Sequence, residues 1–183
     1  MKSRNYSWTL FILILLPVCL TLTSLHTLWA GQTLVKITNG DTGRRISCNV
    51  LEEGEILILT WTNSLFRLLV TETYKAKDGI LEQTDVVFAD PSGKEPPLVK
   101  PEDVDDLYHT GGPFKAEGLT RPFRRIAFRV GEVGNPVLKI QEREIAFVKE
   151  VGFGGTIILE CLLHSKNENA CHSNATNSSR ITQ

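Results

Sequence analysis

Short runs in which every second residue is apolar recur along this chain, and they constrain its fold more than any other feature. In residues 46–50, Ile46, Cys48 and Val50 share one face, and in residues 125–130 apolar side chains alternate with two arginines and an alanine. Alternation with a period of two is typical of β-strands that bury one face. The spacers between the runs are rich in Gly, Pro, Asn and Asp, which predicts antiparallel strands joined by turns.

Further segments extend this pattern. Residues 56–61, ILILTW, are apolar on both faces and favour a central strand, while Leu138 with Ile140 and the run at residues 157–161 indicate two more strands. The Asp-Gly pair within residues 77–79 accepts the positive φ angles of a type I′ hairpin turn. The sequence therefore predicts an all-β fold, a small antiparallel β-sandwich or an open barrel, preceded by an N-terminal transmembrane or signal helix.

The N-terminal segment differs from the rest in its lack of charge. Lys2 and Arg4 precede a stretch from Asn5 to Val35 that contains no Asp, Glu, Lys or Arg. Such a stretch is typical of a signal peptide or an N-terminal membrane anchor, which we assign to residues 1–30. Because the basic residues lie on the short side, the C-terminal part is predicted to lie outside the cytoplasm, held at the cell membrane or released into the periplasm or medium after cleavage.

The overall charge disfavours one class of partner. The chain has 20 basic and 21 acidic side chains, so it carries no strong positive field that would attract nucleic acid. No nucleic-acid partner is expected.

The exported part divides by composition into a domain and a tail. We assign residues 31–164 to the β-sandwich domain and residues 165–183, which are polar and nearly free of apolar side chains, to a disordered tail. Within the domain, residues 90–122 contain six of the eight prolines and the acidic run EDVDD at 102–106, which predicts a long surface loop. Residues 143–152, REIAFVKEVG, fit a short helical turn and a strand equally well.

Three of the four cysteines lie in the exported part, an odd number. One disulfide among Cys48, Cys161 and Cys171 is expected, with one thiol left over. Cys161 and Cys171 are the closer pair in sequence, whereas a bond from Cys48 to Cys161 would join two predicted strands. Both pairings remain open at this point.

The candidate site lies in WTNSLFRLLVTETY, residues 61–74. In an extended strand, Glu72 shares its face with Val70 and Tyr74, so its carboxylate must be partnered or desolvated. Asn63 and Ser64 interrupt the apolar residues just before this strand. One interpretation is a polar ligand-binding pocket made of Asn63, Ser64 and Glu72; the other is that Asn63 and Ser64 cap a chain reversal through the backbone and Glu72 faces solvent at an edge.

Two stretches resemble a known family: WTNSLFRLLVTETYKAKDGILEQTDVVFADPSGKEPP and RIAFRVGEVGNPVLKIQEREIAFVKEVGFGGTIILE. They are similar to the bacterial and archaeal domain-of-unknown-function family 1850, over roughly residues 48–160. The resemblance implies a short exported protein, whose gene in that family often lies beside those of a TAXI-type tripartite periplasmic (TRAP) transporter. It brings no known activity.

The match at the candidate site is incomplete. Members of the family show an aromatic residue, Thr, His and Ser, then a Glu on the next strand, and the corresponding residues here are Trp61, Thr62, Asn63, Ser64 and Glu72. Because Asn63 stands where the family has His, no acid–base or metal role of that imidazole is implied for this chain. A polar cluster of Ser64 and Glu72 is all that the resemblance implies.

These observations favour a non-catalytic accessory protein of a membrane transport system, of the TAXI type if the resemblance holds. Its partner would be the membrane subunit or the solute-binding protein of the transporter, with the N-terminal helix contacting the membrane. The alternatives are a periplasmic or extracellular module that binds a small ligand and, third, a hydrolase that uses Ser64. No complete catalytic constellation is visible. We expect no catalytic residues, cofactor or metal.

Overall fold

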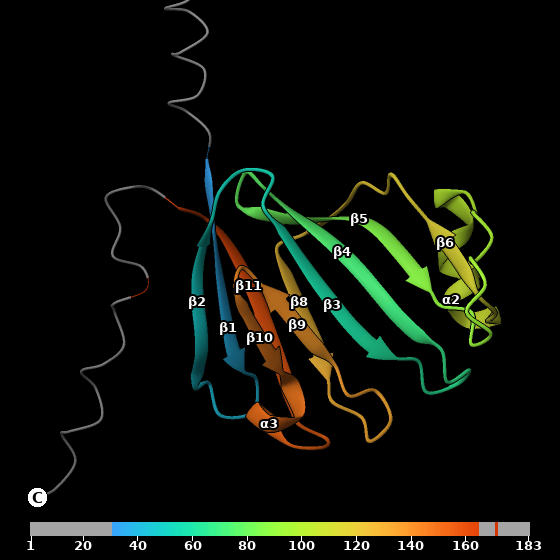
Figure 1. Cartoon of the computed structure of the whole chain (residues 1–183). Coiled ribbons are helices and arrows are strands. Elements are labelled where there is room, and N and C mark those ends of the chain that lie inside the picture. The colour runs from blue at the N-terminus through green and yellow to red at the C-terminus, as the bar shows by residue number, and fades with distance from the viewer. Residues whose placement is uncertain (1–30, 165–170, 172–183) are drawn as a thin grey trace, which may run out of the picture. The chain divides into compact units, whose positions relative to one another are not determined.

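The computed structural model describes residues 31–164 and Cys171, and this part of the chain folds mainly into antiparallel strands. Figure 1 shows them as two sheets packed face to face. The small sheet has the order β2-β1-β11-β8, formed by β1 (Gln32–Asn39), β2 (Arg45–Leu51), β8 (Arg125–Arg129) and β11 (Thr156–His164). The predicted antiparallel sandwich is confirmed for this part, whereas the helix predicted within residues 1–30 lies outside it.

The large sheet has seven strands. Its order is β10-β9-β3-β4-β5-β6, and β7 also pairs with β5. The strands are β3 (Ile56–Thr62), β4 (Leu69–Lys77), β5 (Ile80–Phe88), β6 (Phe114–Ala116), β7 (Arg121–Phe123), β9 (Val137–Ile140) and β10 (Arg143–Ala146). Strand β3 lies between β9 and β4, as its apolar sequence predicted. Among residues 31–164, no helix is long and apolar enough to span a bilayer.

The turn between β4 and β5 has the predicted form. Asp78 and Gly79 have φ angles of 46° and 77°, as a type I′ hairpin turn requires. The Gly79 amide donates a hydrogen bond to Oγ1 of Thr33 on β1, at 3.0 Å. A Cβ atom at position 79 would come within 2.4 Å of the backbone nitrogen of Leu163 on β11. The hairpin of the large sheet therefore packs closely against the small sheet, and only glycine fits there.

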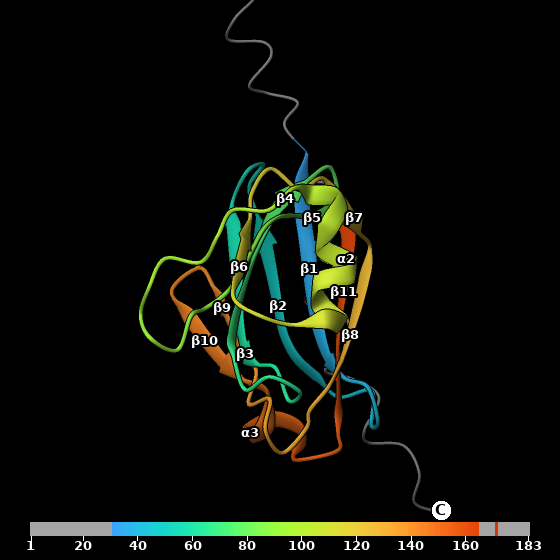
Figure 2. The same ribbon diagram turned by 90° about the vertical axis from the view of Figure 1, so that its right-hand side faces the viewer.

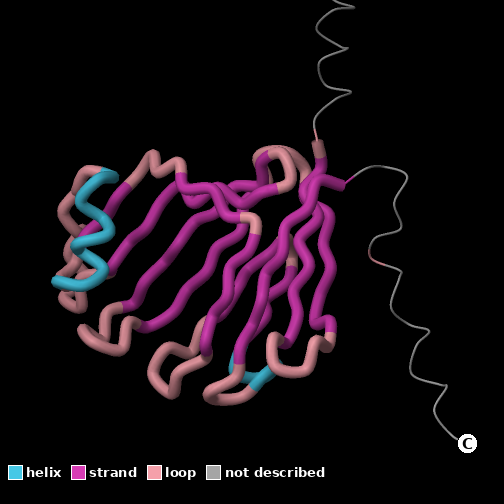
Figure 3. The backbone as a smooth tube through the Cα atoms, turned by 180° about the vertical axis from the view of Figure 1, so that it is seen from behind, coloured by secondary structure: helices cyan, strands magenta, loops and turns pink. Residues whose placement is uncertain are grey.

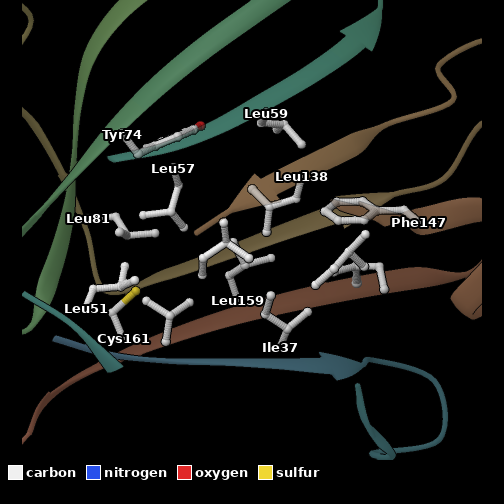
Figure 4. Packing of buried hydrophobic residues seen from close by; sticks show 14 of the residues in the cluster. Ile37, Leu51, Leu57, Leu59, Tyr74, Leu81, Leu138, Phe147, Leu159 and Cys161 are labelled. Carbon is white, nitrogen blue, oxygen red and sulfur yellow. The ribbon is translucent and has the colours of Figure 1, made fainter. Parts of the chain in front are cut away.

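The main hydrophobic core fills the space between the two sheets. Figure 4 shows Leu57, Leu59 and Leu138 from the large sheet facing Ile37 and Leu159 from the small sheet. All five side chains are at most 2% exposed. Burying each such side chain contributes roughly 1.5–3 kcal/mol, so this layer provides the main driving force for the sandwich.

A second, smaller core lies where the large sheet extends past the small one. Figures 1 and 2 show helix α2 (Val104–Thr110) beside β5 and β6, and Figure 3 shows it at one end of the molecule. Val104 of the helix packs with Phe88 and Phe114, which stack with ring centroids 4.5 Å apart. The helix covers apolar side chains of the large sheet that would otherwise face water.

The region predicted to be a long loop, residues 90–122, contains regular structure. It holds the 3-10 helix η2 (Pro101–Asp103), α2, β6 and the start of β7. The apolar residues Val104 and Phe114 anchor it in the second core, while the acidic residues around α2 stay exposed. Residues 143–152, which fitted a strand and a helical turn equally well, form both: strand β10 is followed by helix α3 (Phe147–Val151).

Strand β2 presents the opposite face from the one expected. Ser47, Asn49 and Leu51 are buried, whereas Cys48 and Val50 are only half-buried. The polar pair satisfies itself, because Asn49 donates a hydrogen bond to Ser47 at 2.8 Å. An arginine of β10 donates a second one to the same hydroxyl, at 3.3 Å. Alternation showed that β2 is a strand, but it did not show that the buried face carries a polar pair with one partner on β10.

The disulfide joins Cys48 and Cys171, a pairing different from both that the sequence left open. Cys161 is a free, buried thiol on the inner face of β11, within the main core. Because its side chain points between the sheets, it is not available to a cysteine beyond the end of β11. The other residues of the predicted tail, 165–170 and 172–183, lie outside the described part.

Candidate functional site

Glu72 is a buried carboxylate in the middle of β4. Its side chain is on the inner face of the large sheet with Val70 and Tyr74, as the alternation predicted, and the residue is 6% exposed. Val70 belongs to the second core and Tyr74 to the main core. Glu72 therefore lies at the boundary between the two cores.

Two tyrosine hydroxyls satisfy this carboxylate. The Tyr74 hydroxyl donates to Oε2 and the Tyr108 hydroxyl to Oε1, both at 2.7 Å. Bonds to a charged acceptor are short and roughly twice as strong as those between neutral groups. Burial raises the pKa of both tyrosines well above the usual range, and the charge of Glu72 raises each further. Both hydroxyls therefore keep their protons and remain donors at neutral pH.

The second donor tethers helix α2 to the sheet. Tyr108 lies on α2, and its ring packs edge-to-face on Phe88 at 5.1 Å between centroids. Two neighbours limit the rise in the pKa of Tyr108. One is a hydrogen bond with the side chain of Gln83, buried on β5, and the other is the positive charge of Arg121 on β7. The Arg121 guanidinium also forms an ion pair with Asp105 of α2 at 2.9 Å. A polar bond, an aromatic contact and an ion pair thus hold this helix in place.

Asn63 binds the backbone of its own turn. Its Oδ1 accepts hydrogen bonds from the amides of Leu65 and Phe66, at 2.9 and 3.0 Å. The residue is buried, and both bonds are typical of an Asx turn. This geometry corresponds to the second interpretation of Asn63, in which it caps the chain reversal between β3 and β4.

The turn between β1 and β2 repeats this arrangement. Oδ1 of Asn39 accepts hydrogen bonds from the amides of Asp41 and Thr42, at 2.9 and 3.0 Å. Four residues after each asparagine the backbone is left-handed, at Gly43 with φ 72° and at Arg67 with φ 59°. Because the same turn occurs where no site was predicted, the bonds of Asn63 need no ligand to explain them.

Ser64 is exposed at the tip of the β3–β4 turn. Thr62 and Leu69 are the pair of β3 and β4 residues nearest the turn, and Glu72 pairs with Leu59. Glu72 therefore lies three residues along β4 from the turn. No hydrogen bond joins Asn63 or Ser64 to Glu72 in the described structure. The two parts of the predicted pocket are close along the sheet, but each has its own partners. A ligand-binding role for the three residues stays a prediction.

Sequence reasoning missed the partner of Glu72 that lies on another element, Tyr108. Tyr108 is 36 residues away in a region predicted to be a loop. The signal was the helical spacing of Val104, Leu107 and Tyr108, which places these three side chains on one face. A further polar group lies nearby, because Nε1 of Trp61 is buried with no hydrogen-bond partner in the described structure. Trp61 contacts both cores.

The described residues contain no group of three or more His, Cys, Asp or Glu side chains positioned to hold a metal ion. Scans of this chain against models of protein families, curated proteins and solved structures gave no match.

Proposed function

We propose that this chain is an exported accessory protein of a membrane transport system, tethered at the cell membrane, which acts by binding a protein partner and not by catalysis. The partner is the membrane subunit or the solute-binding protein of a transporter of the TAXI type. The transporter link rests on the resemblance to domain-of-unknown-function family 1850, which is an argument by association.

The observation that carries the binding role is the arrangement around Glu72. A general acid or base must exchange protons with a substrate, and a nucleophilic serine needs a base within hydrogen-bond reach. Both oxygens of Glu72 instead accept bonds from tyrosines, and Ser64 is exposed. The carboxylate of Glu72 holds α2, and Asn63 caps its own turn, so both have structural roles. This supports a function carried by the surface of the domain.

Two further observations support the proposal. The Cys48–Cys171 disulfide is typical of an oxidising compartment outside the cytoplasm. The tethered helix α2 and the preceding turn present an acidic surface, formed by Glu102, Asp103, Asp105 and Asp106, all of them exposed. A rigid charged element of this kind is suited to protein recognition because little ordering is needed on binding.

The test is affinity purification of the full chain, tagged at its C-terminus, from gently solubilised native membranes, with mass spectrometry of the intact chain and its partners. We expect an uncleaved chain together with a transporter subunit. The variant Glu102→Gln/Asp103→Asn/Asp106→Asn should recover less partner, since it removes three exposed charges and leaves the Arg121–Asp105 ion pair intact.

A matched control removes three exposed acidic charges elsewhere, in the variant Glu132→Gln/Glu142→Gln/Glu144→Gln, which should recover the normal amount. The proposal would be overturned by a soluble chain that begins near Gly31 and brings down no partner. Equal losses in both variants would remove α2 as the contact surface.

A second candidate, a module for a small ligand, is favoured by Trp61. Its buried Nε1 has no hydrogen-bond partner among the described residues, and Trp61 pairs in register with Val70, on the same face of the sheet as Glu72. An unpaired buried donor costs free energy that an acceptor on a ligand would recover. This candidate predicts that a ligand from a metabolite screen raises the melting temperature by an amount that grows with its concentration, and that Glu72→Gln reduces the rise.

A further inference from the structure

The densest cluster of positive charge in the domain lies on one short segment. Residues 121–129, RPFRRIAFR, contain four arginines and no acidic residue, in a chain whose charges otherwise nearly balance. Arg121 is engaged by α2, but Arg124, Arg125 and Arg129 are exposed. Arg125 has one acidic neighbour, Glu160, at a long 3.7 Å, and its side chain is 57% exposed. Within the described part of the chain, this segment therefore offers several positive charges without close acidic partners.

The same residues form an edge strand. Strand β8 is the last of the small sheet, and Figure 2 shows it beside β11 at the margin of that sheet. The amide of Cys161 donates to the carbonyl of Arg124, and the amide of Val130 donates to the carbonyl of Gly155. In an antiparallel pair such bonds alternate along the strand, so the even-numbered residues of β8 face β11. The backbone groups of Arg125, Ala127 and Arg129 therefore face away from the sheet.

Two other margins of the sheets bind neighbouring segments at least in part. Along β6, the amide of Val99 donates to the carbonyl of Lys115, and the amide of Lys115 donates to the carbonyl of Pro97. At the margin formed by β2, the side chain of Gln141, in the turn between β9 and β10, donates a hydrogen bond to the carbonyl of Val50, at 3.1 Å. In residues 31–164, the amides of Arg125, Ala127 and Arg129 have no such partner. An unpaired edge is a template for another strand.

We propose that β8 is a docking edge, which binds an extended acidic segment of the partner protein as an additional strand of the small sheet. This inference rests on the proposed function, because it specifies the chemistry of the partner. Backbone groups of Arg125, Ala127 and Arg129 bond to the added strand, and the exposed arginines pair with its carboxylates. The commitment to an acidic segment follows from charge complementarity with residues 121–129.

The geometry also specifies the pattern of the added strand. Arg125 and Arg129 lie four residues apart on the outer face with Ala127 between them, so two acidic residues four positions apart face them. Ile126 and Phe128 are half-buried on the inner face, and apolar residues pair with them. The matching pattern is acidic, apolar, small or polar, apolar, acidic.

The test uses the full chain, labelled with ¹⁵N in non-ionic detergent, and a capped nine-residue peptide that carries Glu-Val-Thr-Val-Glu. The peptide should slow hydrogen exchange at the amides of Arg125, Ala127 and Arg129. Arg125→Gln/Arg129→Gln should weaken binding about two- to thirty-fold, as expected for two exposed ion pairs. The control Lys94→Gln/Lys100→Gln removes the same charge from two exposed lysines and should bind normally.

A second pair of variants separates strand pairing from charge. Ala127→Pro removes a single outward-facing amide, and an edge strand tolerates proline at such a position. Ala127→Thr keeps that amide. The proline variant should lose the protection, and the threonine variant should keep it. Equal binding by both variants would mean that the peptide is held by charge alone and would overturn the proposal. No binding of the acidic peptide would also overturn it.

Three further outcomes are decisive. Binding to vesicles that contain an anionic lipid, without protection of these amides by the peptide, would assign the arginines to the membrane surface and overturn the proposal. If native membranes yield the transporter partner with Ala127→Pro as readily as with the unchanged chain, the accessory function stands and the docking edge fails. If the peptide binds as expected but no partner is recovered from membranes, the docking edge stands and the accessory function fails.

Discussion

At the scale of single residues, Glu72 shows how a buried charge is retained in a small sandwich. An unpaired carboxylate at this depth would cost several kcal/mol. Two hydroxyls remove most of that cost, and because one comes from β4 and the other from α2, the same bonds connect the main core to the helix. The carboxylate thus contributes to specificity: α2 has one position in which Tyr108 reaches it.

Tyr108→Phe tests this arrangement, because it removes one hydroxyl and leaves the ring. We expect the free energy of unfolding at pH 7 to fall by about 1.5–3 kcal/mol, the usual range for a hydrogen bond to a charged group. Urea denaturation followed by circular dichroism measures it. His109→Ala, at an exposed position of the same helix, should have little effect. A fall as small as that of the control would mean that the bond does not hold α2.

The same tyrosines predict a dependence on alkaline pH. Burial raises the pKa of Tyr74 and Tyr108 above the ordinary value of 10.0, so above about pH 10 the unfolded chain loses protons that the folded chain keeps. Unfolding is therefore favoured as pH rises, by up to about 1.4 kcal/mol per pH unit for each tyrosine. Urea midpoints at pH 9, 10 and 11 should fall less steeply for Tyr108→Phe. Parallel slopes would contradict the raised pKa.

At the scale of elements, turns are where side chains determine the path of the chain. Asn39 and Asn63 build the same turn, so Asn39→Ala and Asn63→Ala should each cost about 1–2 kcal/mol for two lost hydrogen bonds. The aspartate variants keep an acceptor and should cost less. Thermal unfolding of all four variants measures this. If Asn63→Ala costs almost nothing while Asn39→Ala is costly, the structural interpretation of Asn63 is wrong.

The β4–β5 turn is constrained in a different way, by contact between the sheets. Gly79→Ala places a methyl group against the backbone of Leu163, in addition to the left-handed strain, so its cost should clearly exceed that of the strain alone. Gly93→Ala is the matched control, since Gly93 has φ 76° and open space around it. We expect about 1–2 kcal/mol for the control and more for Gly79→Ala, measured by urea unfolding. Equal costs would mean that the hairpin moves away from β11 without penalty.

At the scale of the whole molecule, features that depend on local sequence patterns could be predicted, whereas features that depend on contacts between distant residues could not. Alternation and turn chemistry were sufficient for the central strand, the hairpin at Asp78 and the face that Glu72 shares with Val70 and Tyr74, but they left open whether Glu72 is buried or faces solvent. They were insufficient for the buried face of β2, because Ser47 is satisfied by an arginine of a distant strand. They were also insufficient for Tyr108, because a helix within a proline-rich region is held by contacts that only the folded chain forms.

The disulfide is the longest-range of these contacts. It joins residues 123 positions apart, and closing so long a loop in the unfolded chain stabilises the fold by on the order of 5 kcal/mol in the chain-entropy model. Cys48→Ala/Cys171→Ala should therefore lower the free energy of unfolding by about 2–5 kcal/mol, measured by urea denaturation. Reductant should destabilise the unchanged chain to a similar extent and leave the double variant unaffected.

The free thiol should not compete for this bond. Burial raises the pKa of Cys161 to about 12, and disulfide exchange requires the thiolate. Peptide mapping after alkylation of the folded chain should therefore find Cys161 unmodified and Cys48 still bonded to Cys171, whereas alkylation in urea should label Cys161 fully. Labelling of Cys161 at the same rate in both conditions would show that β11 opens readily. In that case the bond would shuffle between partners, and the small sheet could not present β8 as a fixed edge.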